Sequence, residues 1–166
     1  MILEARAASC FSWTYVLKVN DRAIGKYEGQ WFSESQTIDL TERRHLEFRK
    51  VGWLSSQFDL VDLSKEEVVC RCDRAGLFTS AWDLSLSVGA GQLIKPGWFD
   101  TSYEFVFADE TLARIDRLGW CERGWIVDGG DILTDEDLVM IGLVYHTIQH
   151  RRQRQNNAAG GHAGGS

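Results

Sequence analysis

The feature that most constrains the fold is a run of apolar residues from Leu138 to Tyr145, near the end of an otherwise strand-like chain. Side chains of an α-helix follow one another at about 100°, so a helix over this run has no polar face. Such a helix must be enclosed on all sides by protein or by lipid. A bilayer crossing needs about 20 apolar residues, so we expect the protein itself to enclose this much shorter run. The residues predicted to form the core of the helix are Leu138, Ile141, Leu143, Val144 and Ile148.

The boundaries of this helix are marked by capping residues and by charge. Thr134 can cap its N-terminus, with Asp137 three residues later as a variant of the capping box. Acidic residues occupy the first turn and basic residues cluster near the other end, which suits the helix dipole. We predict a helix over about 135–152 and a disordered Gly/Ala-rich tail over 155–166.

Length and charge define a broad class. The chain has 166 residues and a formal net charge of −6. We expect one domain over residues 1–154, which is long enough to bury a core without disulfides or a metal. Residues 1–150 contain 15 basic and 24 acidic side chains, a net charge of −9. So acidic a domain argues against a nucleic-acid partner, because nucleic-acid binding needs a basic surface.

The cysteines and the N-terminus indicate a cellular location. The four cysteines have no CxxC spacing, and Cys70 and Cys72 would point the same way on a strand, where neighbours rarely form a disulfide. We therefore expect buried, reduced thiols. The first residues lack the basic start and apolar stretch of a signal peptide. Together these features predict a cytoplasmic protein that does not span a membrane.

A strand–turn–strand unit recurs three times in the chain. Tyr15–Glu28 aligns without gaps with Tyr103–Asp116, and Phe58–Gly76 is a third copy with a longer turn. Each copy has alternating apolar residues, a polar turn with an aspartate and a returning strand. Further strands are expected at 46–50, 77–87 and 120–127, a loop or short helix at 33–44, and a turn at 89–91.

These segments amount to about 10–12 short strands. That many strands must curl into a barrel or separate into a sandwich. Only a barrel has an interior that can accept the apolar helix. We therefore predict a mainly β (α+β) fold, a closed antiparallel barrel around a C-terminal hydrophobic helix.

The order of these elements resembles the tubby-like superfamily. The matching features are the hairpin Tyr103–Asp116, the strand Gly124–Asp128, and an acidic linker that leads into a central helix over Asp131–Ile148. This superfamily includes the tubby C-terminal domain, the phospholipid scramblases, the plant LURP-one-related proteins and many bacterial members. The resemblance covers most of the chain, from Phe11 to about Arg152, and it implies a β-barrel around a central helix.

The resemblance also implies binding of anionic phospholipid head groups at the inner face of the cytoplasmic membrane. A loop and the start of a strand carry the densest basic cluster, whose side chains could converge on a phosphate. The alternative is a solvated charged segment, because Glu42 and Glu47 are interleaved with the bases. The predicted lipid-binding residues are Arg43, Arg44, His45, Arg49 and Lys50.

A second basic group follows at the end of the helix, at Arg151, Arg152 and Arg154. Each such residue contributes about 1 kcal/mol near an anionic surface, but lipid-binding segments usually contain about four to eight of them. Complementation of the helix dipole is the alternative interpretation.

Metal binding has weak support in the sequence. His146 and His150 have an i, i+4 spacing that zinc can use, but no third ligand has diagnostic spacing. We expect both histidines to be exposed where the helix leaves its enclosure. The aspartates before the helix lack the order of an EF-hand loop. We predict neither a metal nor a cofactor.

Seven tryptophans leave a second function class open. Aromatic rings stack on sugars, and carboxylates could serve hydrolysis, although tryptophan in a barrel wall also packs into the core. Trp98, in a turn, is expected to be the most exposed. Motifs for a nucleophile, a phosphate-binding loop or a dinucleotide are absent. We predict a non-enzymatic binding or scaffold module; the alternatives are a small-molecule or glycan-binding barrel and a protein-interaction subunit.

Overall fold

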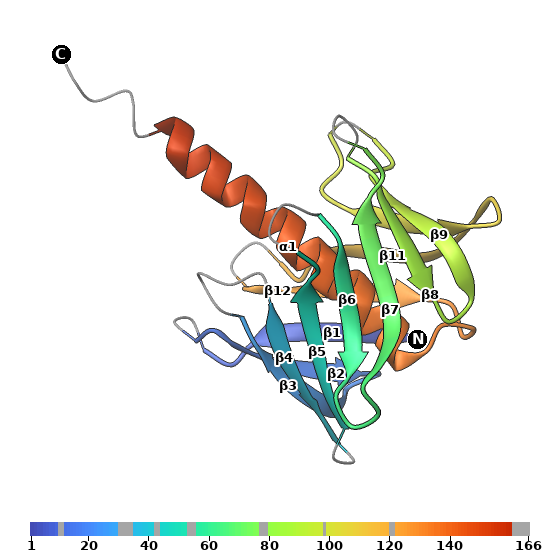
Figure 1. Cartoon of the computed structure of the whole chain (residues 1–166). Helices are drawn as coiled ribbons and strands as arrows, with labels where there is room; N and C mark the ends of the chain where they lie inside the picture. The colour runs from blue at the N-terminus through green and yellow to red at the C-terminus, as the bar shows by residue number, and fades with distance from the viewer. Residues whose placement is uncertain are drawn as a thin grey trace.

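Twelve antiparallel strands form a closed barrel, and one long helix passes through it, which confirms the predicted fold class (Figure 1). This computed structural model describes residues 1–9, 12–29, 35–41, 44–52, 56–76, 80–97, 99–119 and 122–160. The strands are β1 (Ile2–Ala7), β2 (Thr14–Val19), β3 (Arg22–Glu28), β4 (Gln36–Leu40), β5 (Arg44–Lys50), β6 (Phe58–Asp62), β7 (Glu67–Arg74), β8 (Trp82–Leu86), β9 (Gly89–Ile94), β10 (Tyr103–Phe107), β11 (Glu110–Arg117) and β12 (Gly124–Gly129), and the helix is α1 (Asp135–Gly160).

The sheet is an up-and-down meander. Each strand pairs with the next along the chain, and the pairing of β1 with β12 closes the ring. In that closing ladder Leu3 lies opposite Val127 and Ala5 lies opposite Trp125. Closure pairs the first and last strands with each other, so the sheet has no open edge.

The three repeated hairpins share one backbone distortion. A register shift follows Leu17 in β2, Leu60 in β6 and Phe105 in β10, which are equivalent positions in the three copies. A bulge bends a strand and increases its twist. The repeat therefore places the same bend at three points around the barrel and helps the sheet to close.

The first and third of these hairpins, in chain order, also share a turn conformation. Asn20 and Asp21 have φ values of 46° and 66°, and the equivalent Ala108 and Asp109 have 49° and 65°. Positive φ at both central residues is the geometry of a type I′ turn, which suits the twist of a hairpin.

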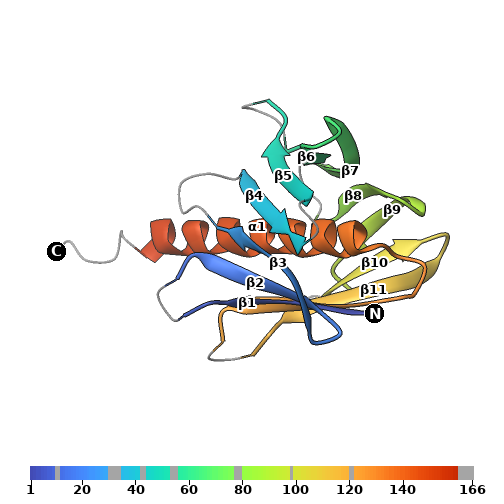
Figure 2. The same cartoon turned by 90° about the horizontal axis from the view of Figure 1, so that it is seen from below.

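The interior of the barrel is filled by α1 (Figure 2). Four of the predicted core residues of the helix are 0% exposed and Ile148 is 6% exposed. Alternate residues of the strands form the surrounding layer, for example Leu46 and Phe48 of β5. At Gly142 a Cβ atom would overlap the ring of Trp125, so the glycine lets the helix backbone pack directly on β12.

The N-terminal cap of the helix is confirmed. The Asp137 N–H donates to Thr134 Oγ1 at 3.2 Å, and the Thr134 N–H donates to Asp137 Oδ2 at 2.9 Å. The predicted C-terminal end is wrong, because the helix continues from 152 to Gly160. Arg, Gln and Ala favour helix, and extending an existing helix needs no new nucleation. Disorder is thus wrong for 155–160, while 161–166 lie outside the described residues.

Three local predictions also need correction. The segment 33–44 contains β4, so a loop or short helix is wrong for 36–40. The stretch 89–91 is the start of β9 rather than a turn, because the chain reverses at Ser87 and Val88. The first strand, β1, was not expected, since its small Ala5 and Ala7 give a weak alternating pattern.

No helix in the described part of the chain has both the length and the apolar character that a membrane crossing requires.

Candidate functional site

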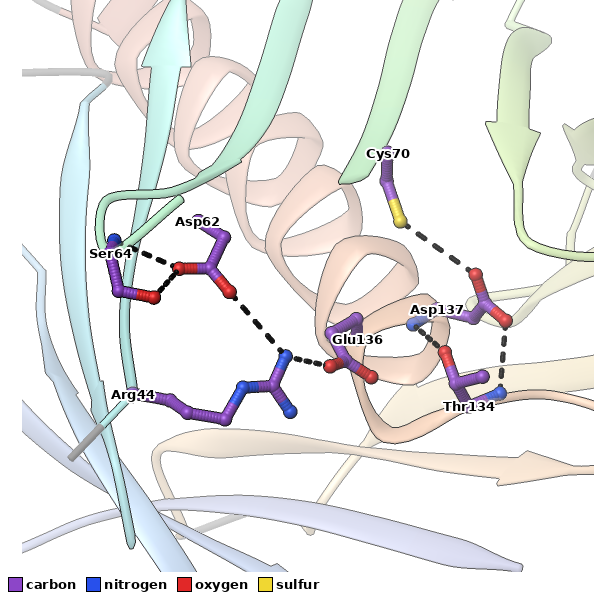
Figure 3. Close-up of polar contacts among 7 residues, drawn as sticks. All are labelled: Arg44, Asp62, Ser64, Cys70, Thr134, Glu136 and Asp137. Carbon is purple, nitrogen blue, oxygen red and sulfur yellow. Dashed lines mark hydrogen bonds and ion pairs between the residues drawn. The ribbon is translucent and has the colours of Figure 1, made fainter. Parts of the chain in front are cut away.

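The two ends of the barrel differ in character. We call the end where α1 begins the closed end, and the end where α1 leaves the barrel the mouth. At the closed end Arg44 forms ion pairs with Glu136 of α1 and, at 4.0 Å, with Asp62 of β6 (Figure 3). The Ser64 hydroxyl and N–H both donate to Asp62 and hold the pKa of this carboxyl below its usual value. This network joins the first turn of the helix to the barrel wall.

Asp137 forms a second link at the closed end. Its carboxylate is fully buried and accepts hydrogen bonds from the Ser87 N–H at 2.8 Å and from the Ser87 hydroxyl. The Cys70 thiol donates to the same carboxylate, with a sulfur–oxygen distance of 3.7 Å (Figure 3). Burial, and then the nearby Asp137 charge, raise the pKa of Cys70, so its thiol stays protonated and unreactive. Cys70 and Cys72 are both free and buried, as expected.

The predicted lipid-binding cluster is not brought together. The alternation of β5 puts Arg44 and Lys50 on the same face as the buried Leu46, and His45 and Arg49 on the other face. Arg44 belongs to the closed end, whereas His45 pairs with Asp39 at 2.8 Å on the outer surface. Arg49 lies 4.0 Å from Glu47. Arg43 lies outside the described residues.

A groove at the mouth gathers basic side chains from two elements, β7 and α1. We call it the basic groove; its volume is about 270 Å³ and it runs between α1 and the ends of β7, β8 and β10. Its lining residues are Arg74, Ser80, Trp82, Tyr103, Ile148, Arg151, Arg152 and Gln155. No acidic side chain is among these described lining residues, although the whole chain is acidic.

Aromatic rings orient two of the three guanidinium groups. The Arg151 guanidinium lies 5.4 Å from the ring centre of Phe58 and 5.6 Å from that of Trp82. Arg152 donates to the Tyr103 hydroxyl at 2.7 Å. Contact with aromatic faces stabilises a guanidinium group and limits its rotamers. The basic groove therefore presents oriented cations, which suits a planar or tetrahedral anion.

The sequence pointed to only part of this groove. Arg151 and Arg152 belong to the second basic group considered above, whereas Arg154 is exposed and does not line the groove. Arg74 had no distinguishing pattern, because only the pairing of β7 with β8 places it opposite Trp82. Lys50 of the predicted cluster lies opposite Phe58, the ring that Arg151 contacts.

A layer of aromatic side chains lies between α1 and strands β2, β3 and β12, on the side of the mouth away from the basic groove. Tyr15 and Tyr27 stack at 4.8 Å, and Tyr27 also lies 6.4 Å from Trp125. The Tyr27 hydroxyl accepts a hydrogen bond from the Trp125 indole at 3.1 Å. It also lies 3.1 Å from His146 Nδ1.

His146 and His150 are each only partly exposed, so the expectation that both are exposed is wrong. Burial, together with His150 and Arg123, lowers the pKa of His146 to about 4, so the ring is neutral near pH 7. Among the described side chains, no three of the His, Cys, Asp or Glu type gather in a way that could hold a metal.

The tryptophans divide between core and mouth. Trp82 and Trp125 are buried, whereas Trp13 is 46% exposed beneath the Arg123 guanidinium, which lies 4.7 Å from its ring centre. The expectation that Trp98 is the most exposed concerns a residue outside the described ranges. The other tryptophans outside them are Trp31, Trp53 and Trp120.

Comparisons with known proteins define the class of this molecule by its fold. No family model matches the sequence, and no curated protein matches it. The structure is similar to the X-ray structure of a protein from Arabidopsis thaliana, AT5G01750, with a TM-score of 0.59 and 10% sequence identity. The match covers 89% of this chain and 91% of the Arabidopsis chain. At that identity the similarity shows a shared barrel around a helix and nothing about activity.

Proposed function

We propose that this protein is a non-enzymatic binding module whose basic groove holds a phosphate group of the kind found in anionic lipid head groups. The observation that carries the proposal is the convergence of Arg74, Arg151 and Arg152 in a groove whose described lining residues include no acidic side chain. Guanidinium groups form paired, charge-assisted hydrogen bonds with phosphate oxygens. Ser80 and Gln155 add neutral donors at the same place.

Two further features support a binding role rather than catalysis. The barrel interior is occupied by α1, so the ligand must bind at the surface of the mouth. The buried Cys70 and Cys72 thiols have raised pKa values because of burial, which disfavours a nucleophilic role. We also propose that the chain is a distant member of the tubby-like superfamily, which the order of its hairpins and helix supports, and that it acts on the cytoplasmic face of a membrane.

Vesicle co-sedimentation tests the groove and the source of the phosphate. We expect binding to phosphatidylcholine vesicles that contain phosphatidylserine, and none to pure phosphatidylcholine. The double variant Arg151→Ala/Arg152→Ala should weaken binding by about tenfold or more, since each arginine contributes about 1 kcal/mol. If the natural source is instead a free phosphate, inorganic phosphate binds the protein in calorimetry while the anionic vesicles do not.

Two control variants distinguish binding by the basic groove from a non-specific effect of net charge. Arg22→Ala/Lys65→Ala removes the same charge from exposed positions near the closed end and should leave vesicle binding within about twofold. His45→Ala/Arg49→Ala tests the cluster predicted from the sequence. The proposal fails if either control weakens binding as much as loss of Arg151 and Arg152.

A further inference from the structure

A second groove lies at the mouth on the opposite side of α1. We call it the tyrosine groove; its volume is about 310 Å³ and it is bounded by α1, by the start of β2 and by the ends of β11 and β12 that face the mouth. The helix contributes Tyr145, Gln149 and Gln153, whereas Arg151, Arg152 and Gln155 line the basic groove. At about 100° per residue Gln149 and Gln153 point nearly opposite to Arg151 and Gln155, whereas Tyr145 and Arg152 lie between these two pairs. The two grooves have no lining residue in common, so we treat them as separate sites.

Tyr145 is the feature of this groove that the fold itself does not explain. The residue is 2% exposed, and its ring packs edge-on against Tyr103 at 5.9 Å. Its buried hydroxyl has no hydrogen-bond partner at normal distance and angle among the described residues. Burial raises the pKa of Tyr145 to about 12, and the neighbouring Gln149 amide opposes this shift. A buried hydroxyl without a partner costs about 1–3 kcal/mol. The packing of the ring against Tyr103 does not require this hydroxyl, so we interpret the hydroxyl as a hydrogen-bonding group for a ligand.

The charged side chains around the groove differ in how strongly the protein engages them. Arg123 donates to the Ser12 carbonyl at 3.1 Å and to the Tyr15 hydroxyl at 3.4 Å, and it stacks on Trp13. Glu122 pairs with Arg6 at 3.3 Å. Arg123 and Glu122 therefore already have partners within the protein.

Arg117 is different. It is the last residue of β11 and shares the inward alternation of Ala113 and Ile115, so its side chain faces the mouth. Its side chain is exposed, and its guanidinium group forms no hydrogen bond or ion pair with the described residues. A cation next to a buried hydroxyl and two side-chain amides can bind a carboxylate and hydroxyl groups together.

We propose that the tyrosine groove binds a small hydroxy acid, with its carboxylate on Arg117 and its hydroxyl groups on Tyr145 and Gln149. The volume is at the lower end of the range for ligand sites, which suits a single-ring molecule such as a sugar acid. Gln153 provides a further planar amide, and the half-exposed Trp13 provides an apolar wall. This inference does not depend on the function proposed for the basic groove.

Calorimetry with two matched probes tests the ligand class. D-glucuronate and D-glucose have the same ring and differ in the carboxylate. We expect glucuronate to bind about tenfold or more tightly, and Arg117→Ala to remove that preference. Equal binding of the two sugars, or no binding of glucuronate at millimolar concentration, would overturn the proposal.

Tyr145→Phe separates a binding role from a structural one. We expect this variant to weaken glucuronate binding by about fivefold or more, while its melting temperature stays equal to or above that of the parent protein. A lower melting temperature would mean that the hydroxyl has a structural partner, and the proposal would fail. Arg74→Ala, from the basic groove, is the matched control and must leave glucuronate binding unchanged. An equal loss in that variant would show that the sugar acid binds in the basic groove, and the proposal would fail.

Discussion

Close packing at single residues determines how α1 fits into the barrel. Trp125 lies directly over Gly142, and its indole also reaches the Tyr27 hydroxyl. The ring is therefore held by the helix on one side and by a hydrogen bond on the other. A side chain at position 142 would have to displace a buried tryptophan, so this position has little tolerance for size.

Gly142→Ala should destabilise the protein by about 1–3 kcal/mol, the usual cost of overpacking a core. In an exposed helix the same change would stabilise by up to about 1 kcal/mol, because alanine favours helix. Urea unfolding followed by tryptophan fluorescence measures the difference. Asn156→Ala, on the exposed end of α1, is the control. An unchanged or higher unfolding midpoint for Gly142→Ala would show that Trp125 can move aside.

The low pKa of His146, about 4, makes stability depend on pH. In the unfolded chain the imidazole titrates near 6.5, so between about pH 6.5 and pH 4 the unfolded state binds a proton that the folded state does not. Stability should therefore be complete above about pH 6.5 and fall by up to about 3 kcal/mol as the pH decreases toward 4.

Chemical denaturation at several pH values measures this slope. His146→Gln should reduce it, because the glutamine does not titrate, whereas His45→Gln is the control for loss of an exposed imidazole. If the slope is the same in His146→Gln as in the parent protein, other groups cause the acid destabilisation.

At the scale of elements, the first turn of α1 is joined to the barrel by polar contacts. Asp137 caps the helix through Thr134 and also binds the β8–β9 turn through Ser87. One carboxylate thus satisfies donors from three segments, because the Cys70 thiol of β7 also donates to it. Because it is buried, its loss leaves several donors without partners.

Asp137→Ala should cost about 2–4 kcal/mol, more than a simple helix cap, which contributes about 1 kcal/mol. Asp135→Ala, in the same turn, removes an acidic residue without the buried contacts and is the control. Thermal melting of the two variants checks the prediction. Equal losses would mean that only the helix dipole is affected.

A substitution in the hairpin turn at Ala108 is expected to stabilise the protein. Alanine there has a φ of 49°, whereas the equivalent Asn20 belongs to a residue type that tolerates positive φ. Ala108→Gly should raise the free energy of unfolding by up to about 1 kcal/mol, because glycine adopts this conformation without strain. The melting temperature measures it, with Asn20→Gly as the control, which should gain less. A lower melting temperature for Ala108→Gly would refute this explanation.

At the scale of the whole molecule, barrel and helix depend on each other. The inner faces of the strands are apolar and contact α1, and the helix has no polar face over 138–145. Neither part can bury its apolar surface alone. The strands are connected in simple order, so the closing ladder between β1 and β12 joins the two ends of the sheet.

A chain that ends at Thr134 should not fold cooperatively, since the barrel would enclose an unfilled apolar space. A chain that ends at Asn157 should melt like the full-length protein, because the residues near this end of α1 are exposed. Near-UV circular dichroism and thermal melting of the two truncated chains test this dependence. A cooperative transition in the shorter chain would show that the barrel is stable without its core helix.

The sequence alone determined the architecture because the relevant physics is local. The apolar run at 138–145 required enclosure, alternation marked most strands, and a threefold repeat marked the hairpins. The end of α1 and the strands β1, β4 and β9 escaped prediction, since weak alternation and helix extension leave little pattern.

Only the tertiary structure determined which side chains lie together in one site. The basic cluster predicted on β5 is divided between two faces by strand alternation, while Arg74 and Arg151, far apart in the sequence, line one groove. That convergence depends on the register of β7 with β8 and on where α1 leaves the barrel. The buried hydroxyl of Tyr145 likewise became visible only once the helix was packed beside β11 and β12. Sequence spacing records which side of an element a residue occupies, but only packing determines its neighbours.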